Sequence, residues 1–157
     1  FQGVVQMPDP RYRIYVQSRK AIDQFYHQEA ARRELPDSVL WLAITICEHE
    51  TPCTPTELYT DCAISKQTGH SALMQLEKRG LIQLVPDPAD RRSKRVEWTE
   101  QGRAFAQSQL HPLLTAEEAA FESLAAGEQE LLITLTQKLY SALKTKAGNT
   151  GPGKGIL

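Results

Sequence analysis

Five side chains at helical spacing are the first candidates for chemistry in this sequence. They stand at positions i, i+3, i+4, i+7 and i+11, and they are Gln67, His70, Ser71, Met74 and Lys78. A helix displays such a set along one stripe. Amide and hydroxyl groups hydrogen-bond to base edges or phosphates, and a DNA major groove about 12 Å wide accepts a helix that carries them. An ordinary solvated helix face has the same pattern, so the segment that follows decides between the two.

A turn rich in cations follows this stripe. Two β-prone runs, residues 81–85 and 95–98, flank the segment PDPADRRSK, whose prolines, aspartates and serine are typical of turns. We predict a hairpin with four cations projecting from it: Arg91, Arg92, Lys94 and Arg95. Between Lys66 and Arg95 seven cations outnumber three carboxylates, a net of +4 in a chain with a formal charge of −1. Because a narrow minor groove attracts arginine, this concentrated charge favours DNA as the partner.

Helix signals place these two features next to each other. Thr54, Pro55 and Glu57 form a capping-box pattern, which predicts a short helix ending near residue 61 or 62. Ser65 is a second N-cap, and the helix after it ends at Gly80. Three apolar side chains predict the buried face of this second helix: Ala72, Leu73 and Leu76. The predicted order is therefore helix, turn, helix and β-hairpin.

At these residues the chain resembles the MarR family of winged-helix transcriptional regulators. Two matching segments are LEKRGLI at residues 76–82 and DPADRR at residues 87–92. A third runs from Asp90 to Gly102 and is similar to the family pattern D-x-R-x-x-x-V-x-L-T-x-x-G, with Trp98 where leucine is usual. Together these motifs are far more specific than a helix-turn-helix pattern alone.

The resemblance implies a homodimer that represses transcription from a pseudo-palindromic operator in double-stranded DNA, in a prokaryotic cytoplasm, until a ligand releases it. It assigns to the major groove Ser65, Lys66, Gln67, Thr68, His70 and Ser71. The wing would place Arg91 and Arg92 in the minor groove, with Asp90 orienting an arginine. Thr54 would offer its amide and hydroxyl to a phosphate. Gly69 stands where the family has a bulkier apolar residue, so it either lets the backbone approach DNA closely or loosens the first turn.

The whole chain predicts a mainly α fold with a small β-hairpin wing. We expect a single domain over residues 4–147, made of a winged helix-turn-helix lobe at about 36–102 and N- and C-terminal dimerisation helices at about 11–34 and 103–146. Residues 1–3 look like the remnant of an expression tag. The glycine-rich residues 148–157 predict a disordered tail.

The second helix of the chain is predicted at the centre of the fold. Pro36 ends the first helix, and Asp37 or Ser38 is expected to cap the second. Residues 39–48 are apolar nearly all round, which is typical of a buried helix. Trp41 belongs to the core in this interpretation, and lining a ligand pocket is the alternative role.

Three helical stretches are predicted after the hairpin. The first covers residues 99–114 with a bend at His111–Pro112, the second covers 116–124, and the third follows an interruption at Gly127 and covers 128–146. The third carries a leucine stripe: Leu132, Leu135, Leu139 and Leu143. In so small a chain this stripe and the aromatic stripe of the first helix lack partner surface, so we expect them to bury each other across a two-fold axis. Folding back onto the lobe is the alternative.

Two kinds of signal could act on such a regulator. The resemblance implies small aromatic or phenolic effectors, for which Tyr12, Tyr15, Trp41 and Phe105 would wall a pocket between the dimer helices and the lobe. Thiol redox sensing is the alternative, through Cys47, Cys53 and Cys62. Their odd number argues against structural disulfides. We expect Cys47 in the core and the other two accessible beside the helix that begins at Thr54.

Other classes of function have little support in the sequence. At 157 residues, 41% hydrophobic and 24% charged, the chain can bury one core, and no apolar run of about 18 residues predicts a membrane span. Catalytic arrangements, phosphate loops and metal-ligand spacings are missing, so we expect neither an enzyme nor a metal or other cofactor. A winged helix that binds an acidic protein partner stays open. Neutral hydrogen-bonding groups beside the cations favour DNA.

Overall fold

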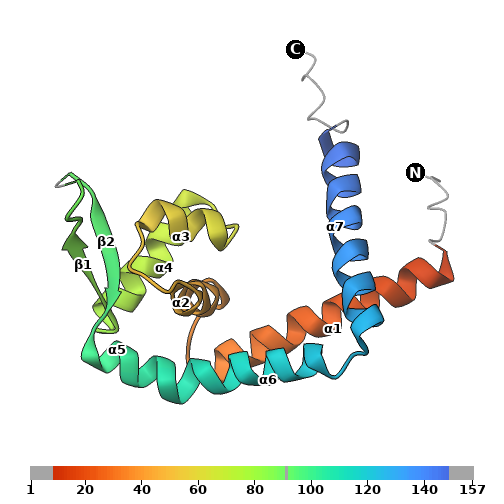
Figure 1. Cartoon of the computed structure of the whole chain (residues 1–157), viewed down its shortest axis with the longest axis horizontal. Coiled ribbons are helices and arrows are strands. Elements are labelled where there is room, and N and C mark those ends of the chain that lie inside the picture. Colours follow the sequence, from red (N-terminus) through yellow and green to blue (C-terminus); the bar gives the residue numbers. More distant parts are fainter. Residues whose placement is uncertain (1–8, 91, 149–157) are drawn as a thin grey trace, which may run out of the picture. The chain divides into compact units, whose positions relative to one another are not determined.

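The computed structural model describes residues 9–90 and 92–148 of a mainly helical chain with one β-hairpin, as predicted (Figure 1). Its elements are α1 (Pro10–Arg32), α2 (Asp37–Glu48), α3 (Pro55–Asp61), α4 (Lys66–Lys78), β1 (Ile82–Pro86), β2 (Lys94–Trp98), α5 (Glu100–Phe105), the π-helix η1 (Ala106–Leu110), α6 (His111–Glu122) and α7 (Ala126–Gly148). The described residues up to Pro112 form one compact unit, and those from Leu113 form a second. Within the described ranges no helix combines the length and the apolar composition that a membrane span needs.

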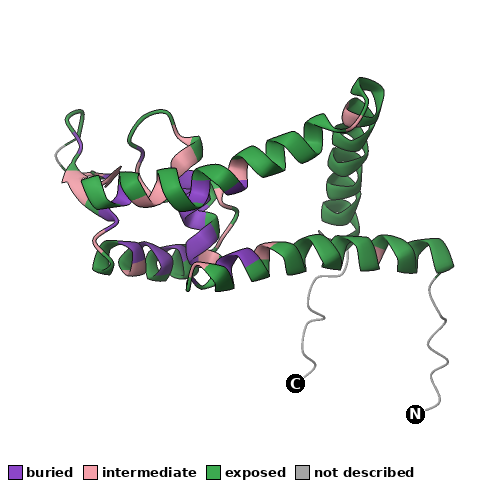
Figure 2. Cartoon of the chain, turned by 90° about the horizontal axis from the view of Figure 1, so that it is seen from below, coloured by how far each residue is buried: buried purple, intermediate pink, exposed green. Residues whose placement is uncertain are grey.

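Helix α2 lies at the centre of the first unit, which confirms the prediction from its apolar sequence. It contacts α1, α3, α4 and η1. Every side chain from Val39 to Ile46 is buried except that of Trp41. Figure 2 shows the buried residues gathered in this part of the chain. The helix-turn-helix and the hairpin are therefore built around one apolar helix.

Two predictions about α2 are wrong. Trp41 is not a core residue, because it is 39% exposed, and its ring packs 4.5 Å from the ring of Tyr26 on α1. Neither Asp37 nor Ser38 caps the helix, since Pro36 holds the cap position and makes no side-chain hydrogen bond. The carboxylate of Asp37 instead lies 3.0 Å from Nδ1 of His27 on α1. This contact joins the two helices while leaving negative charge at the start of α2, where the helix dipole favours it.

The helix-turn-helix forms as predicted. Thr54 begins α3 with a complete capping box, and Ser65 begins α4 by accepting a hydrogen bond from the Thr68 amide at 3.1 Å. Gly80 follows α4 with a φ of +70°, which glycine adopts at little steric cost. The predicted inward side chains are buried: Ala72, Leu73 and Leu76.

The hairpin is an antiparallel pair that is attached to the lobe at its outer edge. Ile82 lies opposite Trp98 in the register of β1 and β2. Strand β1 begins one residue later than predicted. Leu81 is instead a buried connection, whose carbonyl accepts a hydrogen bond from the Thr99 amide at 3.0 Å. On the other side of β2, the Val96 amide donates to the carbonyl of Cys53 at 2.8 Å. The loop between α2 and α3 therefore holds β2 at the middle of the hairpin.

The chain after the hairpin differs from the prediction. The bend expected at His111–Pro112 occurs one turn earlier as η1, in which the His111 amide donates to the carbonyl of Ala106 five residues back. Pro112 has no amide hydrogen, and a wider turn lets the preceding carbonyls reach other amides. Helix α6 then continues to Glu122 without the break expected near residue 115.

The last helix starts and ends outside its predicted limits. The break before it covers residues 123–125, and Gly127 already lies in the first turn of α7, where an added side chain would meet open space. The helix reaches Gly148, the first residue of the predicted disordered tail. The rest of that tail and the proposed tag remnant at residues 1–3 lie outside the described residues.

Candidate nucleic-acid interface

The exposed face of α4 carries the polar groups that the sequence assigns to the major groove. The assigned side chains are all exposed: Ser65, Lys66, Gln67, Thr68, His70 and Ser71. Ser65 Oγ accepts from the Thr68 amide and donates to the Thr68 hydroxyl at 2.9 Å, so both hydroxyls help to start the helix. In the described part of the chain, no hydrogen bond ties down the side chains of Gln67, His70 or Ser71. These three keep their donors and acceptors for another molecule.

Gly69 is explained by packing between α3 and α4, and close approach to DNA is not its role. It is buried, and a Cβ at this position would lie 2.3 Å from Cδ1 of Tyr59 on α3. Tyr59 is 7% exposed, so its ring fills the space that a larger residue on α4 would need. The bulky side chain that the family places on α4 is thus replaced by a ring from α3.

Thr54 does not have the free donors that the sequence assigns to a phosphate. Its amide and its hydroxyl both donate to Oε2 of Glu57, at 2.7 and 2.9 Å. These hydrogen bonds, the one from the amide first, lower the pKa of the Glu57 carboxyl, which therefore stays ionised at neutral pH. A phosphate could bind here only if this carboxylate moved away.

The tip of the hairpin is a tight turn closed by an aspartate. Asp90 Oδ1 accepts from the Arg92 amide at 2.9 Å, and the Asp90 carbonyl accepts from the Ser93 amide at 2.9 Å. Arg92 and Lys94 are exposed, while Arg91 lies outside the described residues. Asp90 therefore shapes the backbone of the turn, whereas the sequence interpretation has it orient an arginine side chain.

A different aspartate holds an arginine. Nε of Arg95 lies 3.0 Å from Oδ2 of Asp87, in an ion pair without hydrogen-bond alignment, and Arg95 Nη1 donates to the Pro52 carbonyl at 3.4 Å. A hydrogen bond from the Ala89 amide, followed by the contact with Arg95, lowers the pKa of Asp87. Arg95 thus lies against the loop between α2 and α3, one residue pair from the outer end of the paired strands, and does not project freely as predicted. The sequence carries no local signal for this pair, because aspartate is ordinary in a turn.

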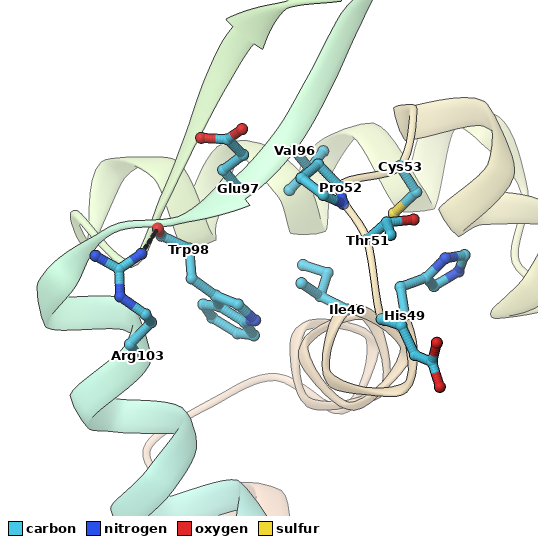
Figure 3. A pocket seen from close by; sticks show the side chains of 10 residues that line it. Ile46, His49, Thr51, Pro52, Cys53, Val96, Glu97, Trp98 and Arg103 are labelled. Carbon is cyan, nitrogen blue, oxygen red and sulfur yellow. Dashed lines mark hydrogen bonds between the residues drawn. The ribbon is translucent and has the colours of Figure 1, made fainter.

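A hollow of about 220 Å³ lies where the hairpin meets the lobe (Figure 3). Ile46, Pro52 and Trp98 are among its walls. Nη1 of Arg103 donates to the Trp98 carbonyl at 2.9 Å, and a Cβ on Gly102 would lie 2.8 Å from the Trp98 ring. Trp98, which stands where the family has leucine, is therefore fixed between the hairpin and α5. Among the described residues, no group of three or more histidines, cysteines and carboxylates is placed to hold a metal ion.

The four residues predicted to wall an effector pocket do not meet within one chain. Tyr12 and Tyr15 contact each other, with ring centroids 6.2 Å apart, whereas Trp41 contacts Tyr26. At a rise of about 1.5 Å per residue, Tyr26 lies about 20 Å along α1 from Tyr12. Phe105 lies on α5, and none of the four lines the hollow beside Trp98. The sequence prediction grouped these four side chains because all are aromatic. The length of α1 separates Tyr12 and Tyr15 from Trp41.

The three thiols lack the properties of redox sensors. Cys53 is buried, although we expected it to be accessible, and Cys47 is only partly buried, although we expected it in the core. Burial, with a smaller effect of nearby carboxylates, raises the pKa of both thiols to about 11. Burial also raises the pKa of Cys62. Because the thiolate is the reactive form, these cysteines are poor nucleophiles at neutral pH.

The order of elements and the exposed groups define a winged helix-turn-helix protein. Helix α4, the second helix of the helix-turn-helix, presents a polar face. The hairpin that follows it exposes the cations Arg92 and Lys94. Residues 34–93 match the sequence profile of the MarR family. The HTH-type transcriptional repressor NicR of Pseudomonas putida is 30% identical over 117 residues, which cover 74% of this chain and 73% of NicR. The chain belongs to the MarR family of transcriptional regulators.

Solved structures share this fold. A probable transcriptional regulator from Pseudomonas aeruginosa is 29% identical and superimposes with a TM-score of 0.60, over 80% of this chain and 96% of the other. BpsR from Bordetella bronchiseptica is 18% identical and superimposes with a TM-score of 0.63, over 89% of this chain and 96% of BpsR. The relatives are regulators, a class of protein without enzymatic activity.

Proposed function

We propose that this regulator binds double-stranded DNA as a homodimer and represses transcription until a small effector releases it. The observation that carries the proposal is the exposed polar face of α4 next in sequence to a hairpin with Arg92 and Lys94 exposed. Neutral amide and hydroxyl groups can read base edges, and cations can neutralise phosphates. The similarity to a protein named as a repressor supports the sign of regulation.

Dimerisation is supported by two exposed apolar stripes. One on α1 includes Ile14, Tyr15, Ile22 and Phe25, and the other on α7 includes Leu132, Leu135, Leu139 and Leu143; these side chains are between 39% and 64% exposed. Apolar surface of this extent is typical of an interaction site. A two-fold axis would place two copies of α4 about 34 Å apart, which is one turn of DNA.

A small aromatic acid is the first effector class to test. The structure of BpsR is described as showing regulation of its DNA binding by 6-hydroxynicotinic acid. Such a ligand releases DNA by binding more tightly to a dimer whose two lobes are spaced wrongly for DNA than to the DNA-bound dimer. The coupling free energy between ligand binding and DNA binding is typically 1–3 kcal/mol. Addition of 6-hydroxynicotinic acid to the protein–DNA complex is therefore the first release experiment.

DNA binding itself is tested by fluorescence anisotropy with short duplexes from a random library and from the regulator's own upstream region, at two salt concentrations. We expect selective binding of one dimer per site, with affinity that falls steeply as salt rises because about six phosphates are neutralised. Weak binding that is indifferent to sequence would contradict the proposal and direct attention to an acidic protein partner.

The contribution of the hairpin is tested by replacing Arg91 and Arg92 with alanine. We expect at least a tenfold loss of affinity and a salt dependence reduced by about two charges, because each lost phosphate contact lowers the slope by about one. The matched control removes two exposed cations of α7 that lie outside its leucine stripe, Lys138 and Lys144, and should leave binding unchanged. Equal affinities of the double arginine variant and the wild type would remove the hairpin from the mechanism.

A further inference from the structure

Met74 is an apolar residue at the centre of a polar surface. Its side chain is 51% exposed. From Pro55 to Trp98, among the residues that the structure describes, it is the only large hydrophobic side chain that is exposed. At 100° per residue it projects within about 20° of Gln67 and between the directions of His70 and Ser71. About half of this side chain is therefore not used for packing inside the chain.

The surroundings of Met74 form a shallow hollow. Its lining consists of Ser71, Met74, Gln75, Glu77 and Lys78. Met74 lies about 10 Å along the axis of α4 from Gln67, a distance of about three base-pair steps. A helix that places Gln67 against one base would therefore bring Met74 against the major-groove edge of another base in the same half-site.

We infer that Met74 determines sequence specificity by contacting the C5 methyl group of a thymine in the major groove. This inference rests on the DNA binding proposed above. The thymine methyl is the apolar group that base pairs present in the major groove, and a base edge without it offers Met74 no apolar partner. The unbranched thioether side chain adapts its shape to such a contact. Hydroxyl and amide neighbours supply hydrogen bonds to adjacent positions, so the methionine adds a preference that they cannot provide.

A double-mutant cycle tests this contact. Duplexes are first selected from a random library with the full-length wild-type protein. Each thymine of the selected half-site is then replaced by uracil, which removes only the methyl group. Affinities of the wild type and of Met74→Ala are measured by anisotropy for every duplex. We expect one uracil position per half-site to weaken wild-type binding about fourfold, as for loss of one buried methyl group, and to leave the Met74→Ala protein unaffected.

Each other outcome overturns the inference. A selected half-site without thymine, or a uracil effect that is equal in both proteins, shows that Met74 does not contact a methyl group while DNA binding stands. Absence of any sequence-selective binding removes the proposed function and the inference together. Met74→Leu is the companion variant, because it keeps an apolar side chain and should keep part of the uracil effect. Thymines in the flanking DNA serve as the internal control and should tolerate uracil in both proteins.

Discussion

At the scale of single residues, Gly69 and Tyr59 show how one position on a surface helix can be set by its neighbour. Glycine costs about 1 kcal/mol in a helix relative to alanine, so its presence calls for a compensating contact. That contact is with the Tyr59 ring, because a Cβ added to residue 69 would lie only 2.3 Å from the ring atom Cδ1. The glycine sets how closely α3 and α4 pack and therefore how the polar face of α4 is presented.

We predict that Gly69→Ala lowers the free energy of unfolding by about 1–3 kcal/mol, because the added methyl overpacks the site, even though alanine favours the helix. Urea denaturation measures the change. Gly127→Ala is the matched control, since nothing lies within 4 Å of a Cβ there, and it should be neutral or stabilising by up to about 1 kcal/mol. Combining Gly69→Ala with Tyr59→Leu should recover part of the loss. Equal stability of Gly69→Ala and the wild type would contradict this explanation.

At the scale of elements, the hairpin is defined by how it is anchored. Strand β2 is joined to the lobe through the hydrogen bond between Val96 and Cys53 and through the contact of Arg95 with the Pro52 carbonyl. Arg95 also contacts Asp87, which lies in the turn of the hairpin. The turn is held by local hydrogen bonds of Asp87 and Asp90. The attachment of β2 lets the lobe position the hairpin while Arg92 remains available to a partner.

We predict that Asp87→Asn loosens the hairpin, because Arg95 loses its charged partner. Amide exchange followed by NMR should become faster at the Asp87 amide, which donates to the Ser93 carbonyl at 3.0 Å, and at the Ser93 amide, which donates to the Asp90 carbonyl at 2.9 Å. The pKa of Asp87 is lowered from its ordinary value of 3.8, so its stabilising effect is complete above that value and is lost as the pH falls below it. Protection in the wild type should therefore decline below about pH 4, and in Asp87→Asn it should be low and constant. The same protection in both proteins at pH 6 would refute the anchoring role.

At the scale of the whole molecule, the exposed apolar stripes of α1 and α7 support the proposed dimer. Helix α7 is exposed along nearly all of its length, as Figure 2 shows for this second unit. Its leucines would lose contact with water only against another surface, and burying several of them stabilises an interface by about 1.5–3 kcal/mol for each fully buried side chain. In the proposed dimer a second copy of the chain would supply that surface.

We predict that Leu135→Asp combined with Leu139→Asp converts the protein into a monomer, because two carboxylates would be buried in place of apolar side chains and burying a charge is costly. Light scattering coupled to size-exclusion chromatography measures the mass. Gln137→Asp is the control, since its side chain projects from the opposite side of α7, and it should stay dimeric. A dimer that survives the double substitution would place the interface elsewhere, and a wild-type monomer would refute the dimer proposal.

Local contacts explain what the sequence determined by itself. The capping box at Thr54, the cap at Ser65 and the positive φ at Gly80 all depend on residues within a few positions along the chain. The apolar pattern of α2 was sufficient to place that helix in the core. These features, with the cationic turn, were enough to predict the helix-turn-helix and the hairpin. The motifs at residues 76–82, 87–92 and 90–102 carried the resemblance to the family.

Contacts between distant residues account for what only the tertiary structure decided. Tyr59 against Gly69 and Arg95 against Asp87 join neighbouring elements, and Arg33 donates to the carbonyl of Gln109, 76 positions away, at 2.8 Å. Sequence patterns report which face of a helix is apolar, but they carry no distance between two elements. The roles of Gly69 and Asp87 therefore emerged only when packing brought each residue against its partner, because a side chain's function depends on what occupies the space beside it.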